Sequence, residues 1–90
     1  MIKERVITVI KAKGLKNPQL EELTGIGRYT WQNLRNKPGR EIKEEEAEAI
    51  AELYPEYAMW LISGKVIPEA GQTSPEYDEA NKNLKEQGQG

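Results

Sequence analysis

The spacing of apolar residues near the N-terminus predicts a first helix. In IKERVITVIKAK, residues 2–13, the charged residues fall outside an apolar stripe made by Ile2, Val6, Val9 and Ile10. The β-branched run at residues 6–10 is also compatible with a strand. A helix is favoured because the charges lie off the stripe and Gly14 follows as a C-terminal stop signal.

A second, shorter helix is predicted to end within LEELTGIGRYTWQNLRN, residues 20–36. Asn17-Pro18 marks its start, with Asn as the N-cap and Pro at the first helical position. We expect this helix to cover about residues 18–24 and to bury Leu20 and Leu23. Gly25 ends it, because glycine adopts a positive φ at little cost.

A third helix is predicted immediately after this glycine. We expect Ile26 to fill the turn and the helix to cover about residues 28–36, with Trp31 and Leu34 facing inward at a spacing of three. The helix ends at Lys37-Pro38-Gly39, a strong helix-breaking sequence. The two short helices are therefore joined by a tight glycine-containing turn.

Two further helices are predicted between residues 43 and 64. Residues 43–53 carry an inward stripe formed by Ala47, Ile50, Ala51 and Tyr54. The acidic run Glu44-Glu45-Glu46 is interpreted as the N-terminal face of this helix, where the helix dipole favours acids, rather than as a metal site. Pro55 opens a short helix, PEYAMWLIS, that ends at Gly64. The expected core comprises Val6, Val9, Ile10, Leu20, Leu23, Ile26, Trp31, Leu34, Ile50, Leu53, Trp60 and Leu61.

The sequence changes character after residue 64. Residues 65–90 are polar, hold two of the five prolines and end in Gly and Gln, although Ser74-Pro75 predicts a short helix over 75–86. The fold class is therefore all-α, with a domain at 1–64 and a partly disordered C-terminal tail at 65–90. Val66, Ile67 and Tyr77 are the tail's candidate contacts for a homodimer.

Composition excludes several classes of protein. The 90 residues contain no Cys and no His, which removes disulfide frameworks, zinc fingers, thiol nucleophiles and the usual general base. We expect no enzyme, no cofactor and no metal site, since no nucleophile, base and orienting group converge. With no membrane-length apolar run and no signal peptide, a soluble cytoplasmic protein without a membrane partner is expected.

The net charge of −2 conceals an asymmetry between the two halves. Residues 1–40 contain nine Lys/Arg and three acids, a net +6, and residues 41–90 contain four Lys/Arg and twelve acids, a net −8. A basic half on an acidic body is compatible with a phosphate-binding face. Charge alone is equally compatible with solvated helix surfaces.

The helix over 28–36 has an outer face rich in hydrogen-bonding groups. Candidate contacts to base edges are Arg28, Tyr29, Gln32, Asn33 and Asn36, which share this face at spacings of three and four. Arg can pair bidentately with guanine, and Gln or Asn with adenine. Candidate contacts to phosphates are Lys16, Asn17, Arg35, Lys37 and Arg40. Two helices joined by a glycine turn form a helix-turn-helix, whose second helix enters the major groove.

The segment resembles the Cro/lambda-repressor-like helix-turn-helix family over about residues 2–65. The resemblance is carried by LEELTGIGRYTWQNLRN and by AEAIAELYPEYAMWLISGK, whose ending is similar to that of phage and prophage repressors. It implies a compact five-helix bundle in which Gly25 and Ile26 form the turn and Trp31 and Leu34 pack against the preceding helix. The chain departs from the family at Glu21, where a small residue is usual, so Glu21 must tilt outward or pair with a base such as Arg28.

Two functions follow from these observations. The first is a sequence-specific transcriptional regulator, expected to be a phage or prophage repressor, that binds double-stranded DNA as a homodimer on an inverted repeat. The second is a protein-interaction module or antirepressor-like partner of the transcription machinery, which keeps the bundle without binding DNA. The acidic half and the exposed segment PEYAMWLISGKVI favour the second.

Overall fold

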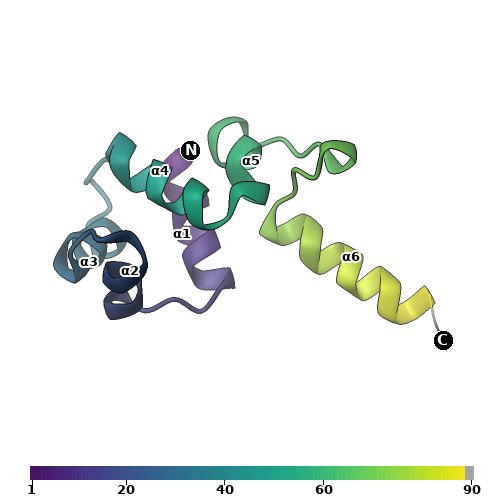
Figure 1. The fold of residues 1–90 in the computed structure, drawn as a ribbon, viewed down its shortest axis with the longest axis horizontal. Helices are drawn as coiled ribbons and strands as arrows, with labels where there is room; N and C mark the ends of the chain where they lie inside the picture. The colour runs from purple at the N-terminus through teal and green to yellow at the C-terminus, as the bar shows by residue number, and fades with distance from the viewer. Residues whose placement is uncertain (89–90) are drawn as a thin grey trace.

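The computed structural model describes the backbone of residues 1–88 and the side chains of residues 1–82. Within this part of the chain there are six α-helices and two 3₁₀ turns, and no strand beyond an isolated antiparallel bridge between Ile67 and Gln72. The elements, shown in Figure 1, are α1 (Ile2–Ala12), α2 (Asn17–Thr24), α3 (Arg28–Asn36), α4 (Glu44–Leu53), η1 (Pro55–Tyr57), α5 (Ala58–Ser63), η2 (Pro68–Ala70) and α6 (Pro75–Gly88). The all-α prediction is confirmed for these residues.

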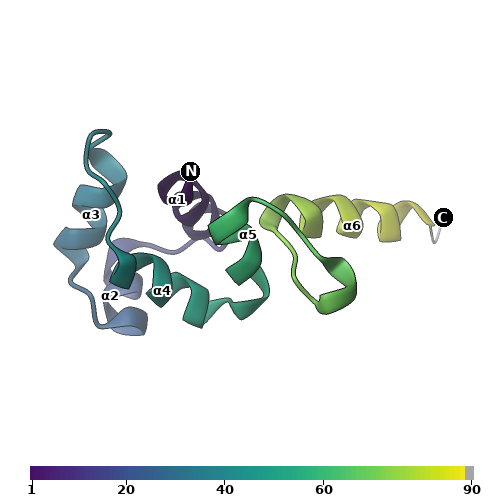
Figure 2. The same ribbon diagram turned by 90° about the horizontal axis from the view of Figure 1, so that it is seen from above.

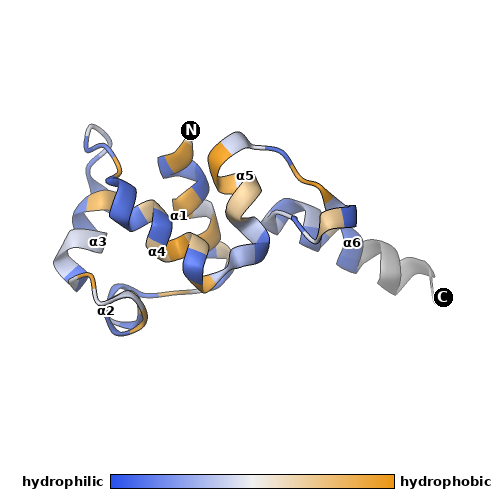
Figure 3. Ribbon diagram, turned by 45° about the horizontal axis from the view of Figure 1, so that its top comes forward, coloured by the Kyte–Doolittle hydropathy of each residue, from blue (hydrophilic) through white to orange (hydrophobic). Residues whose placement is uncertain are grey.

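The core is formed where α1 meets α4 and α5 and where α2 packs against α3 and α4. The fully buried apolar side chains are Val6, Val9, Ile10, Leu20, Trp31, Leu34, Ile50, Tyr57 and Leu61. Eight of these nine were predicted, and the predicted residues Ile26, Leu53 and Trp60 are partly buried against them. Figure 3 shows the apolar residues concentrated on α1, α4 and α5 and the polar residues along α6.

Leu23 was wrongly predicted to lie in the core, because 52% of it is exposed. Thr24 takes the inward position at the end of α2 instead. Its hydroxyl donates to the carbonyl of Leu20 (2.5 Å) and accepts from the indole Nε1 of Trp31 (3.2 Å) and the backbone N–H of Ile26 (3.1 Å). A single hydroxyl therefore joins α2, the turn and α3.

The start of α2 lies one residue earlier than predicted. Lys16, not Asn17, precedes the helix, and its backbone N–H donates to the side-chain oxygen of Gln19 (2.9 Å). Gly25 ends the helix with φ at 76°, the left-handed conformation that the sequence required there. The predicted turn is therefore confirmed.

The loop between α3 and α4 is fixed by a buried ion pair. Arg40 donates to both carboxylate oxygens of Glu46, Nη1 to Oε1 at 2.9 Å and Nη2 to Oε2 at 2.6 Å, and the backbone N–H of Lys43 donates to Oε1 at 2.9 Å. Glu46 is 0% exposed. The interpretation of Glu44-Glu45-Glu46 as the first turn of a helix is confirmed, and Glu46 differs from its two neighbours because its charge is compensated inside the fold.

The segment after residue 64 is attached to the body by hydrogen bonds. The Gln72 side chain accepts from the N–H of Met59 and donates to the carbonyl of Pro55, and the Tyr57 hydroxyl donates to Asp78 at 2.7 Å. The predicted helix after Ser74-Pro75 is confirmed as α6, which projects from the body in Figures 1 and 2. The predicted disorder of the last few residues includes 89–90, which lie outside the described residues, so it stays a prediction there.

Candidate nucleic-acid interface

The outer face of α3 is open to solvent. All five predicted base-contacting residues are exposed, namely Arg28, Tyr29, Gln32, Asn33 and Asn36, whereas Trp31 and Leu34 on the opposite face are fully buried. Tyr29 is 74% exposed, which is high for an aromatic side chain. Figures 1 and 2 place α2 and α3 at the end of the molecule opposite α6, so the C-terminal helix does not cover this face.

Two of the predicted phosphate-contacting residues form a hydrogen bond with each other. Arg35, in the last turn of α3, donates from Nη1 to the side-chain oxygen of Asn17 (3.0 Å) and to the carbonyl of Leu15 (3.3 Å). This pair joins the end of α3 to the start of α2. Lys16, which precedes Asn17 in the chain, and Lys37, which follows α3, both have exposed side chains.

Arg40 has a structural contact that the sequence prediction did not include. Its guanidinium binds the buried Glu46, its side chain is only 20% exposed, and the hydrogen bonds that it donates to Glu46 raise its pKa. The phosphate contact of Arg40 stays a prediction, but in this structure its main task is to neutralise a buried carboxylate.

Lys3 was missed by the sequence analysis. Its ammonium group donates to three carbonyl oxygens of the loop after α3, those of Lys37 (2.8 Å), Pro38 (3.3 Å) and Arg40 (2.6 Å). Because it uses all three of its donors on this loop, Lys3 fixes the backbone that carries the exposed Lys37 side chain. No local pattern connects residues 34 or more positions apart, so the sequence offered no signal for this contact.

Glu21 and Arg28 connect α2 to the first residue of α3. The carboxylate accepts from the Arg28 side chain, at 3.0 Å from Nε and 2.8 Å from Nη2, and from the Arg28 backbone N–H at 3.0 Å. These hydrogen bonds lower the pKa of Glu21 and raise that of Arg28. The predicted pairing of Glu21 with Arg28 is confirmed.

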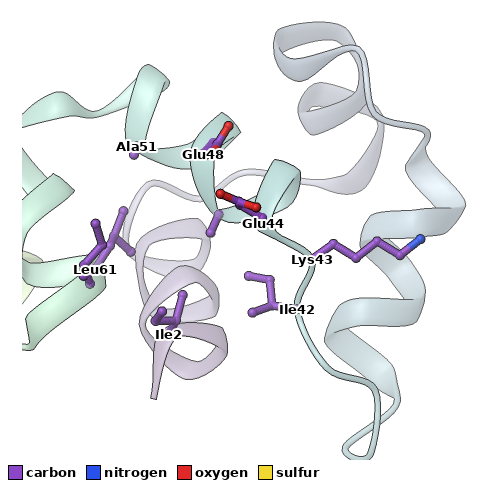
Figure 4. A pocket seen from close by; sticks show the side chains of 9 residues that line it. Ile2, Ile42, Lys43, Glu44, Glu48, Ala51 and Leu61 are labelled. Atoms are coloured by element: carbon purple, nitrogen blue, oxygen red, sulfur yellow. The ribbon is translucent and has the colours of Figure 1, made fainter.

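An apolar groove of about 400 Å³ lies apart from α3, between α1, α4 and α5. Figure 4 shows Ile2, Ile42 and Leu61 around it, with Glu44 and Glu48 on the α4 side. No group of three or more potential metal-ligating side chains occurs within the described residues. In the same part of the chain, every helix is too short or too polar to traverse a lipid bilayer.

The fold and the α3 face together define a small all-helical protein that exposes one polar helix at an end of its body. Among solved structures, Pf6r from the filamentous phage Pf6 of Pseudomonas aeruginosa PA01 is similar, with 42% sequence identity and a TM-score of 0.82. The match covers 92% of this chain and 95% of that one, and the chain belongs to the same family as Pf6r. No protein-family model and no curated protein matches the chain.

Proposed function

We propose that this protein is a sequence-specific regulator of transcription that binds double-stranded DNA. The supporting observation is the exposed polar face of α3, held in place by the buried Trp31 and Leu34. In this proposal α2, α3 and the turn at Gly25 act as a helix-turn-helix of the lambda-repressor type, and α1–α5 form its five-helix domain. The similarity to Pf6r, a phage protein, supports a phage or prophage origin, and we propose that the protein acts as a repressor.

The α3 helix would lie in the major groove with its outer face toward the bases. Gln32 and Asn33 can each offer one donor and one acceptor to adenine, which is the pattern that adenine presents in that groove. The exposed Lys16 and Lys37, which lie before α2 and after α3 in the chain, would contact phosphates, which set the position of the protein but carry no sequence information. Tyr29 would contact a sugar or a base edge.

The proposed active form is a homodimer on an inverted repeat. Dimeric helix-turn-helix proteins place their two recognition helices in half-sites about 34 Å apart, one turn of the duplex. Val66, Ile67 and Tyr77 are only partly buried and remain available to a second copy.

Selection of bound duplexes from a random pool, followed by footprinting, tests this proposal. Replacing Gln32 and Asn33 by Ala should relax sequence preference, because base contacts are lost. Lys37→Ala should weaken binding to all sequences alike and reduce the salt slope by about 1. Lys82→Ala is the matched control, since this exposed lysine lies on α6 at the opposite end. If the variant without the Gln32 and Asn33 side chains keeps an unchanged sequence preference, α3 is not the helix that contacts the bases.

The apolar groove supports the alternative, an interaction module that acts on the transcription machinery. In that case the protein would show no binding to any duplex at low salt but would co-purify with a polymerase or a repressor. Ile42→Asp, which places a charge in the groove, would then abolish co-purification. A wild-type protein that binds duplex DNA with a defined sequence preference excludes this alternative as the main function.

A further inference from the structure

The carboxylate of Glu21 has two separate contacts with Arg28. Its Oε2 accepts the backbone N–H at 3.0 Å, and its Oε1 accepts both Nε and Nη2 of the side chain. The residue before Arg28 is Gly27, which has no side chain to cap the helix. Glu21 therefore supplies the missing capping acceptor from the neighbouring helix and holds the guanidinium with the same carboxylate.

The pairing leaves one edge of the guanidinium open. A guanidinium is planar and offers its five N–H groups as a rigid fork. Glu21 occupies the side edge formed by Nε and Nη2, while Nη1 and the second hydrogen of Nη2 have no acceptor among the described residues. The Arg28 side chain is 47% exposed, so this open edge is accessible.

An open guanidinium edge with two parallel donors matches one base in particular. Guanine presents O6 and N7 side by side in the major groove, and arginine binds this pair bidentately. A free arginine must first lose the rotational freedom of its long side chain, whereas an arginine fixed by a carboxylate has already lost most of it. The negative charge of Glu21 also weakens the attraction of the Arg28 guanidinium to phosphates, which every DNA sequence carries. Glu21 would therefore favour the base contact of Arg28 over its sequence-independent contacts.

We infer that Glu21 is a specificity-determining residue, which orients Arg28 so that its free Nη1–Nη2 edge reads a guanine facing the start of α3. The inference rests on the proposed DNA-binding function. It assigns sequence recognition to a residue that itself touches no base, since Glu21 acts through the arginine. A purely structural pair would stabilise the junction of α2 and α3 without favouring any base.

The test compares Glu21→Gln, Glu21→Ala, Arg28→Ala and the charge-swapped double variant E21R/R28E. For each, duplexes selected from a random pool are sequenced, and the thermal midpoint is measured by circular dichroism. Wild type should enrich guanine at one position of each half-site. Arg28→Ala should abolish that enrichment, and both Glu21 variants should reduce it roughly fivefold or more at that position only. Positions read by Gln32 and Asn33 should be unaffected.

The double variant separates recognition from stability. Restoring an ion pair of reversed polarity should return the thermal midpoint toward wild type, but the carboxylate at residue 28 should favour cytosine, whose amino group donates. Restored guanine preference in this variant overturns the inference. It is also overturned if guanine preference survives in folded Glu21→Gln, or if binding falls evenly across all sequences. A wild-type protein that selects no sequence removes the DNA-binding function itself, and the inference with it.

Discussion

Removing the carboxylate of Glu46 should destabilise the protein more than any surface substitution. Glu46→Ala leaves the Arg40 guanidinium and the Lys43 N–H without the acceptor that both share. Breaking a buried ion pair by removing one partner costs about 3–5 kcal/mol. The lower end applies because 20% of the Arg40 side chain remains exposed and can be hydrated. A loss of about 3 kcal/mol lowers the midpoint of a domain of this size by roughly 15 °C.

Thermal unfolding at pH 7, followed by circular dichroism, measures this loss. Glu45→Ala, at the exposed neighbouring position, is the matched control and should cost less than about 1 kcal/mol. The double variant R40M/E46L removes both charges and should recover at least half of the lost stability, because no unpaired charge remains. A decrease below about 5 °C for Glu46→Ala, or a double variant no more stable than the single one, refutes this reasoning.

The same pair predicts how stability depends on pH. Burial alone raises the pKa of Glu46, but hydrogen bonds from Arg40 and from the Lys43 N–H outweigh burial, so the pKa lies below that of an ordinary glutamate. A lowered pKa means that the pair stabilises the fold fully above the unfolded carboxyl's pKa of about 4.3. The stabilisation is lost as the pH falls through the lower, folded value. Glu46→Gln should therefore flatten the acid limb of the stability curve relative to wild type.

Three further changes follow from single contacts. Lys3→Met removes the three hydrogen bonds to the loop after α3, so it should speed amide hydrogen exchange in that loop and weaken DNA binding at all sequences. Unchanged exchange would contradict the role of Lys3 in fixing the loop. Tyr57→Phe removes the hydrogen bond to Asp78, so it should cost about 1 kcal/mol and make α6 more sensitive to limited proteolysis. Gly64→Ala should cost at least about 1 kcal/mol, because φ is 74° and an added Cβ would lie 2.8 Å from Nη2 of Arg5. In the double variant Arg5→Ala/Gly64→Ala only the clash is relieved, so the lost stability should return in part. Full recovery of stability would argue against backbone strain at residue 64.

Local patterns predicted the helices and the open face of α3. The spacing of Trp31 and Leu34 and the breaker at Gly25 each act within one or two turns, which is the range that helical periodicity reports. Leu23 was misplaced because Leu is more apolar than Thr, although the Thr24 hydroxyl satisfies three partners in the inward position.

The contacts that the sequence analysis missed join distant residues. The buried Tyr57 donates a hydrogen bond from its hydroxyl to Asp78, 21 residues away. Lys3 reaches the loop after α3 across at least 34 residues. Arg40 and Glu46 are near in sequence, but a run of three glutamates gives no indication of which one turns inward. The pairing of Glu21 was anticipated because the resemblance to the helix-turn-helix family expects a small residue there, so a glutamate had to tilt outward or pair with a base such as Arg28.

The position of α6 has a practical consequence for experiments on solid supports. The helix extends away from the rest of the chain at the end remote from α3, and the molecule measures 45 Å along its longest axis. A tether joined to the C-terminus would hold the protein with Gln32 and Asn33 pointing into the solution. Sensor chips and pull-down beads prepared in this way would leave the reading surface unobstructed.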